Sequence, residues 1–219
     1  MPSLSFLFQG IIVPTSVSIP LVMALAKYRV APLPLRTILV YLIIAGITNG
    51  VAAALAFHHT NNLPLLHIYT IIELIVLGTF FYQLFNNQVV KKWVLVVIGL
   101  FSLFCIINLS FIQHLYSFNT YTRSLEAIIL IVFSALYFYL QINRNTWTRW
   151  SDKPETWIVI GIMLYFSSAL IQFSFSNIVS KRVSFNTKMI IWNIHASLVL
   201  IMYLLFAAGF AKCKKLQTI

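Results

Sequence analysis

Charged side chains are scarce in this chain, and acidic ones are almost absent. Only 9% of its 219 residues are charged, and four acidic residues stand against 15 Lys and Arg. Soluble domains of this size carry about 25% charged residues. Hydrophobic residues make up 60% of the chain, and the mean hydropathy is +0.91. Too little polar sequence remains to cover a soluble fold, so the composition excludes a soluble nucleic-acid-binding protein and predicts a membrane protein.

Cysteine and the common catalytic motifs are also lacking. The chain has two cysteines, Cys105 inside an apolar run and Cys213 in a basic tail, at predicted depths too different for a disulfide. No Gly-rich phosphate loop, CxxC pair or HExxH motif occurs in the sequence. The stretches between apolar runs are short, which excludes a kinase, nucleotide-binding or DNA-binding domain.

Long apolar runs fill the rest of the chain. Each is close to the ~20 residues that cross a bilayer, and together they predict spans at about 6–26, 36–57, 64–86, 92–115, 120–142, 156–177 and 187–211. We therefore predict an all-α fold, a single integral membrane bundle of seven transmembrane helices over residues 1–219. Pro14 and Pro20 predict a kinked first helix, retained rather than cleaved as a signal peptide. Gly46 and Gly50, followed by Ala54, predict a close helix contact in the second span.

The basic residues predict the orientation of the bundle. When the spans alternate in direction, 11 of the 15 Lys and Arg fall on the side of the C-terminus, and the other side holds Arg123, Lys181, Arg182 and Lys188. The positive-inside rule then predicts an outside N-terminus and a cytoplasmic C-terminus, in the plasma membrane. Four of the five tryptophans fall near the same predicted inner interface, as anchoring aromatics do: Trp93, Trp147, Trp150 and Trp157.

Polar residues within the predicted spans gather in the opposite, outer half of the bilayer. All five histidines fall in that half or at its rim: His58, His59, His67, His114 and His195. Several further groups fall there too, namely Glu73, Glu126, Asn49, Asn108, Gln172 and Asn193. A polar group buried in a membrane is costly unless it is paired. The clustering therefore predicts a polar pocket in the outer half.

Glu73 is the first candidate for this pocket. It lies about ten residues, or ~15 Å, into the third span, and Tyr69, one turn earlier, shares its face. Its alternative role is a neutral side chain hydrogen-bonded to a neighbouring helix. Glu126, with Arg123 three residues before it, forms either a local ion pair near the interface or part of the pocket. His195 is either a buried histidine with one partner or a ligand contact.

The pocket candidates are thus Glu73, Tyr69, His195, Gln172, Asn49, Glu126 and His67. They favour small-molecule binding, sensing or transport, with the bilayer and an unknown small molecule as partners, and no nucleic acid. The basic inner loops offer a docking place for a cytoplasmic partner. The alternative function is an intramembrane metal-dependent hydrolase of a lipid-like substrate, with zinc held by Glu73, His195 and His67. A third interpretation is a structural subunit whose polar groups only fix helix packing.

Overall fold

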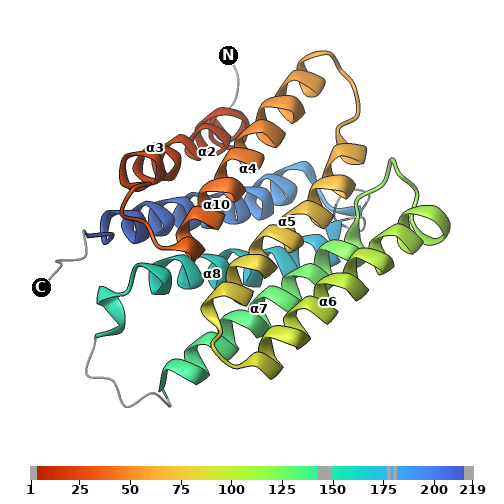
Figure 1. The fold of residues 1–219 in the computed structure, drawn as a ribbon. Helices are drawn as coiled ribbons and strands as arrows, with labels where there is room; N and C mark the ends of the chain where they lie inside the picture. Colours follow the sequence, from red (N-terminus) through yellow and green to blue (C-terminus); the bar gives the residue numbers. More distant parts are fainter. Residues whose placement is uncertain (1–3, 143–148, 177–178, 180–181, 215–219) are drawn as a thin grey trace, which may run out of the picture.

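The computed structural model describes residues 4–142, 149–176, 179 and 182–214, and every regular element within them is helical (Figure 1). Seven helices of this part are long and apolar enough to cross a membrane. They confirm the predicted all-α class and indicate an integral membrane protein. Their bounds are Phe8–Lys27, Leu33–Phe57, Leu63–Leu84, Gln88–Ile112, Thr120–Ile142, Pro154–Ser174 and Phe185–Ala211, within a few residues of the predicted spans. Four of the basic residues and tryptophans counted from the sequence lie outside the described residues: Arg144, Trp147, Lys181 and Lys215.

The first span is interrupted where the prolines predicted a kink. After α1 (Leu4–Leu7), it consists of the π-helix η1 (Phe8–Ile12), α2 (Val13–Thr15) and α3 (Ser18–Lys27). The break between α2 and α3 lies four residues before Pro20, which has no N–H to donate to the carbonyl of Ser16. The bend places Gln9 against the last helix, where its Nε2 donates to Asn193 Oδ1 over 2.7 Å.

The six remaining spans are α4 (Leu33–Phe57), α5 (Leu63–Leu84), α6 (Gln88–Ile107) continuing as η2 (Asn108–Ile112), α7 (Thr120–Ile142), α8 (Pro154–Ser174) and α10 (Phe185–Ala211), with the 3-10 turn η3 (Trp150–Asp152) before α8. Five of them begin at sequence features that favour helix initiation. A proline occupies the first turn of α4, α5 and α8, where its missing N–H costs no hydrogen bond. Asn87 and Ser184 cap α6 and α10 by accepting from backbone N–H groups.

Consecutive helices run antiparallel, and α8 packs along both α7 and α10, while α3 lies against α10 and α4 against α5 (Figure 1). The bundle therefore has two distinct ends. We call the end with connections 58–62 and 113–119 the cavity end. The end with connections 28–32 and 85–87 and residues 149–153 and 212–214 is the basic end.

The half of the bundle toward the basic end is a packed apolar core. Its fully buried side chains include Leu35, Leu42, Leu77, Phe80, Phe81, Phe206 and Phe210. Helix α8 approaches α10 closely at Gly209, where an added Cβ would lie 2.9 Å from the backbone oxygen of Pro154. The close contact predicted at Gly46 and Gly50 is absent at Gly50. A Cβ at Gly46 would make an ordinary contact, 3.9 Å from Cγ1 of Val17, whereas a Cβ at Gly50 would meet nothing within 4 Å, because α4 is exposed there.

Candidate functional site

A buried cation lies between two carboxylates near the middle of the bundle. Arg123, in the first turn of α7, donates from Nη1 to Glu73 Oε2 on α5 and, over 2.6 Å, to Glu126 Oε2 one turn along α7. Its Nη2 donates to the hydroxyl of Tyr165 on α8 over 2.6 Å. The exposed fractions of Glu73, Arg123 and Glu126 are 1%, 6% and 0%. These three residues, called the ion triad below, join α5 to α7 away from water.

Two tyrosines complete the environment of Glu73. The hydroxyls of Tyr41 on α4 and Tyr69 on α5 donate to Glu73 Oε1 over 3.0 and 3.1 Å. Glu126 is less well satisfied, since its Oε1 is buried and has no hydrogen-bond partner among the described residues. A buried carboxylate oxygen without a donor is costly. The two acids of the triad are therefore not equivalent.

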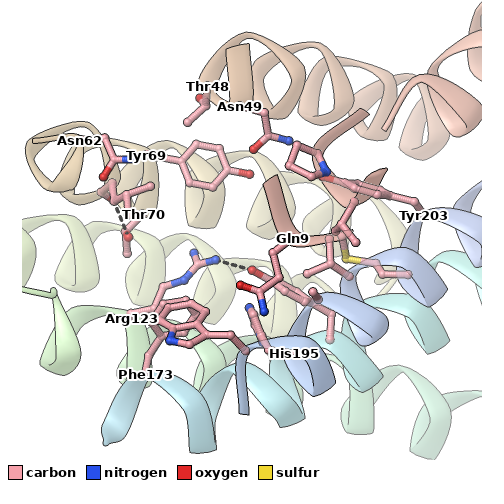
Figure 2. A pocket seen from close by; sticks show the side chains of 18 of the residues that line it. Gln9, Thr48, Asn49, Asn62, Tyr69, Thr70, Arg123, Phe173, His195 and Tyr203 are labelled. Carbon is pink, nitrogen blue, oxygen red and sulfur yellow. Dashed lines mark hydrogen bonds between the residues drawn. The ribbon is translucent and has the colours of Figure 1, made fainter. Parts of the chain in front are cut away.

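A cavity of about 390 Å³ lies above the ion triad, toward the cavity end (Figure 2). Its volume falls in the range of small-molecule pockets, about 300–1,000 Å³. Arg123 reaches its wall from α7, and His195 and Phe173 lie on the same side, while Asn49 and Tyr69 lie across from them (Figure 2). The polar residues around it are Gln9, Tyr41, Thr48, Asn49, Asn62, Tyr69, Thr70, Asn119, Arg123, Tyr165, His195 and Tyr203. No acidic residue is among the described residues that line it.

The structure brings some of the predicted pocket residues together and separates others. Tyr69, Asn49 and His195 line the cavity. Glu73 and Glu126 do not line the cavity, but both accept hydrogen bonds from Arg123, which does. Tyr41 and Tyr69 also line it and donate to Glu73.

Two predicted residues lie elsewhere. The ring of His67 is hydrogen-bonded through Nε2 to the backbone oxygen of Ser117 over 3.1 Å, which ties α5 to the 113–119 connection. Gln172 lines a separate hollow of about 210 Å³ between α8 and α10, together with Ile194 and one side of His195. Neither residue lines the cavity above the ion triad.

His195 lies in an aromatic environment with one polar contact. Its Nδ1 is 3.3 Å from the hydroxyl oxygen of Ser168 on α8. The ring centroids of Tyr165 and Phe173 each lie 5.4 Å from that of His195. The residue is 8% exposed and faces the cavity, so it can contact a ligand while Ser168 fixes its ring.

Sequence reasoning did not identify the centre of the site. Arg123 and Glu126 were expected either as a local ion pair near the interface or as part of the pocket. The pair exists, but it is buried and extends to Glu73, and Arg123 also lines the cavity. Tyr41 and Tyr203 were also missed, although each places a hydroxyl well inside an apolar run. That pattern is the signal that would have found them, because a tyrosine deep in a membrane needs a partner for its hydroxyl.

The described residues include no group of three or more His, Cys, Asp or Glu that could hold a metal ion. The proposed zinc set of Glu73, His195 and His67 therefore has no ligand cluster in this structure. His67 is engaged with Ser117, and Glu73 is engaged with Arg123 and two tyrosines.

The described residues thus form an all-α bundle with seven candidate membrane spans and a polar cavity beside a buried ion triad, which indicates an integral membrane protein. No protein-family model matches the chain, and no curated protein or solved structure resembles it significantly.

Proposed function

We propose that this protein binds a small molecule in the cavity, with the cavity end outside the cytoplasmic membrane and the basic end in the cytoplasm. The observation that carries the proposal is the position of Arg123, whose guanidinium is held from behind by two carboxylates and also lines a cavity of ligand size. The positive-inside rule supports the orientation, since Lys27, Arg29, Arg36, Lys91, Lys92, Arg149, Lys153, Lys212 and Lys214 all lie toward the basic end.

The hydrogen bonds of Arg123 indicate what kind of ligand fits. A guanidinium has five N–H donors, and described residues accept three bonds from this one, at Glu73, Glu126 and Tyr165. The remaining donors are available to an acceptor on a ligand. We therefore propose a ligand with a carbonyl or carboxylate oxygen directed at Arg123.

The walls of the cavity indicate the rest of the ligand. Phe173, Trp192 and the ring of Tyr203 offer apolar area, and Asn49 and Asn119 offer amide groups closer to the cavity end. Pockets with mostly apolar walls and a few placed polar groups suit small amphipathic molecules. The ligand we propose is thus amphipathic, with an oxygen-bearing end toward Arg123 and an apolar body against the aromatic side chains.

The packing on the other side of the triad favours recognition over transport. Leu77, Phe80 and Phe81 on α5 and Phe206 and Phe210 on α10 are fully buried between the triad and the basic end. In this conformation these side chains form an apolar layer between the ion triad and the basic end. A sensor would pass the binding signal to a partner at the basic end.

The test is a thermal-shift screen of the full chain, purified in mild detergent, against small carboxylic acids, amides and amines. We expect an acceptor-bearing amphipathic compound to raise the melting temperature of the wild-type protein. Thr48→Phe, which fills the cavity, should abolish the shift. Ile47→Phe is the matched control, since Ile47 is the preceding residue on α4 and is 62% exposed outside the bundle.

Two results would contradict the proposal. One is a compound that stabilises Thr48→Phe as strongly as the wild-type protein, because its site would then lie outside the cavity. The other is a screen in which only amines stabilise the protein, because a cationic end would not be directed at Arg123.

A further inference from the structure

A second concave surface lies at the basic end, remote from the cavity. A cleft of about 870 Å³ is bordered by residues 29–36, by η3 and the first turn of α8, and by the residues that follow α10. We call it the basic cleft. Its charged residues are Arg29, Arg36, Lys212 and Lys214 on one hand and Asp152 and Glu155 on the other. Four cations against two acids leave a formal excess of two positive charges.

The four cations of the cleft are not neutralised within the described part of the chain. The ion pairs found there both belong to the ion triad, so none of the four is paired with Asp152 or Glu155. All four are also exposed. Their charge is therefore available to a ligand from outside the protein.

Two of these cations are oriented by uncharged groups. The Nε of Arg36 donates to the backbone oxygen of Ala31 over 3.0 Å, and its guanidinium lies 5.1 Å from the ring centroid of Tyr28. The Nζ of Lys212 lies 6.0 Å from the ring centroid of Trp157. Such contacts order a side chain without removing its charge. Arg36 and Lys212 are thus partly preorganised for an anion.

Apolar side chains adjoin the cations in the same cleft. Val30, Leu33 and Pro154 contribute to its lining, and Leu33 is 63% exposed. A soluble anion makes no use of this apolar surface, whereas a membrane lipid presents a phosphate next to its glycerol and acyl chains. Arg and Lys bind phosphate oxygens through charge-assisted hydrogen bonds.

From this combination we propose that the basic cleft binds the phosphate headgroup of an anionic phospholipid. Arg36 and Lys212 contact the phosphate, and Leu33 lies along the start of an acyl chain. In the orientation proposed above, on which this step rests, the basic end faces the cytoplasm, and the cleft meets the leaflet surface where anionic lipids are concentrated. The inference is independent of the ligand in the cavity.

The test is native mass spectrometry of the full chain in mild detergent, titrated with phosphatidylglycerol, phosphatidylethanolamine or phosphatidylcholine. We expect a discrete phosphatidylglycerol adduct that is tighter than either other lipid. Each basic side chain contributes on the order of 1 kcal/mol to binding an anionic lipid, so Arg36→Gln/Lys212→Gln should weaken phosphatidylglycerol binding about 30-fold. Lys91→Gln/Lys92→Gln is the matched control, because it removes the same charge at the same end but outside the cleft. It should keep the wild-type affinity.

Several outcomes would overturn the proposal. Equal weakening in both double variants would show diffuse attraction to surface charge rather than a site. Phosphatidylethanolamine binding as tightly as phosphatidylglycerol would exclude selection for an anionic lipid. Glycerol 3-phosphate tests for a soluble ligand that carries the same phosphate group. If it binds as tightly as the whole lipid, the cleft recognises a phosphate, but its ligand is not a membrane lipid. The melting temperature of each variant without added lipid checks that it folds, and Thr48→Phe should leave lipid binding unchanged.

Discussion

The two halves of this bundle differ in packing: the half toward the basic end is dense and apolar, and the half toward the cavity end surrounds a polar cavity. Toward the basic end, Leu and Phe side chains are fully buried, and glycine allows α8 and α10 to approach closely. Toward the cavity end, the same helices separate around about 390 Å³ of space lined by amides, hydroxyls and a guanidinium. Lipid offers no hydrophobic force between helices, so dense packing must supply much of the stability. The densely packed half toward the basic end therefore fixes the helices whose other ends surround the cavity.

The ion triad lies at the boundary between these halves. It links α5 to α7, and it connects to α4 and α8 through Tyr41 and Tyr165. Substitutions that remove charges from the ion triad should therefore have the largest effect on stability, and substitutions of the glycines in each half should have the next largest.

Arg123→Gln should cause the largest loss of stability. It leaves Glu73 and Glu126 buried without their cation, and breaking a buried ion pair on one side costs about 3–5 kcal/mol. The triple variant Glu73→Gln/Arg123→Gln/Glu126→Gln removes the unpaired charges and should recover most of the loss. Unfolding of both proteins in mixed detergent measures this difference. A single variant as stable as the wild-type protein would contradict a structural role for the triad.

Gly209→Ala should destabilise the packed half. The new Cβ would lie 2.9 Å from the backbone oxygen of Pro154, which cannot rotate away as a side chain does. Overpacking of this kind costs about 1–3 kcal/mol. Gly50→Ala on α4 is the control, since nothing lies within 4 Å of its added Cβ. If both variants lose the same stability in thermal unfolding, the two halves do not differ in packing as described.

The two acids of the triad should respond differently to neutralisation. Glu73 accepts from two tyrosine hydroxyls at Oε1 and from Arg123 at Oε2. The amide of Glu73→Gln can keep its oxygen toward Arg123 only by turning its NH₂ toward the tyrosine hydroxyls, which then lose their charged acceptor and must rotate to accept. Glu126→Gln can keep its oxygen toward Arg123 and place its NH₂ where Oε1 now has no partner. A hydrogen bond to a charged group contributes about 1.5–3 kcal/mol, and we expect Glu73→Gln to lose an amount in this range.

We expect Glu126→Gln to lose about 1 kcal/mol or less, because it also removes a surplus buried charge. Equilibrium unfolding of the two variants under identical conditions gives the comparison. A larger loss for Glu126→Gln than for Glu73→Gln would reverse the assignment of the poorly satisfied oxygen to Glu126.

The spans could be predicted from the sequence because hydropathy is a property of each segment alone. The same holds for the depth of Glu73, Tyr69, Asn49 and His195, which follows from counting residues along a helix. Which helices meet, and at what rotation, depends on packing between segments far apart in the chain. Arg123 and Glu73 are 50 residues apart, and no local pattern encodes their contact. The contact predicted at Gly50 was wrong for the same reason, since small residues permit a close contact only where a neighbour is present.

Cys213 offers a probe of how far the tight packing extends toward the basic end. It lies just beyond α10, is 2% exposed, and burial raises the pKa of its thiol to about 11. Only the thiolate reacts with alkylating reagents, and a raised pKa keeps the group protonated at neutral pH. In a Cys105→Ala background, labelling by iodoacetamide should be about 200-fold slower at pH 8 than for the denatured chain, whose thiol has a pKa near 8.5. The rate should rise about tenfold per pH unit until pH approaches 11. Labelling as fast as in the denatured chain would show that the packed half ends before Cys213.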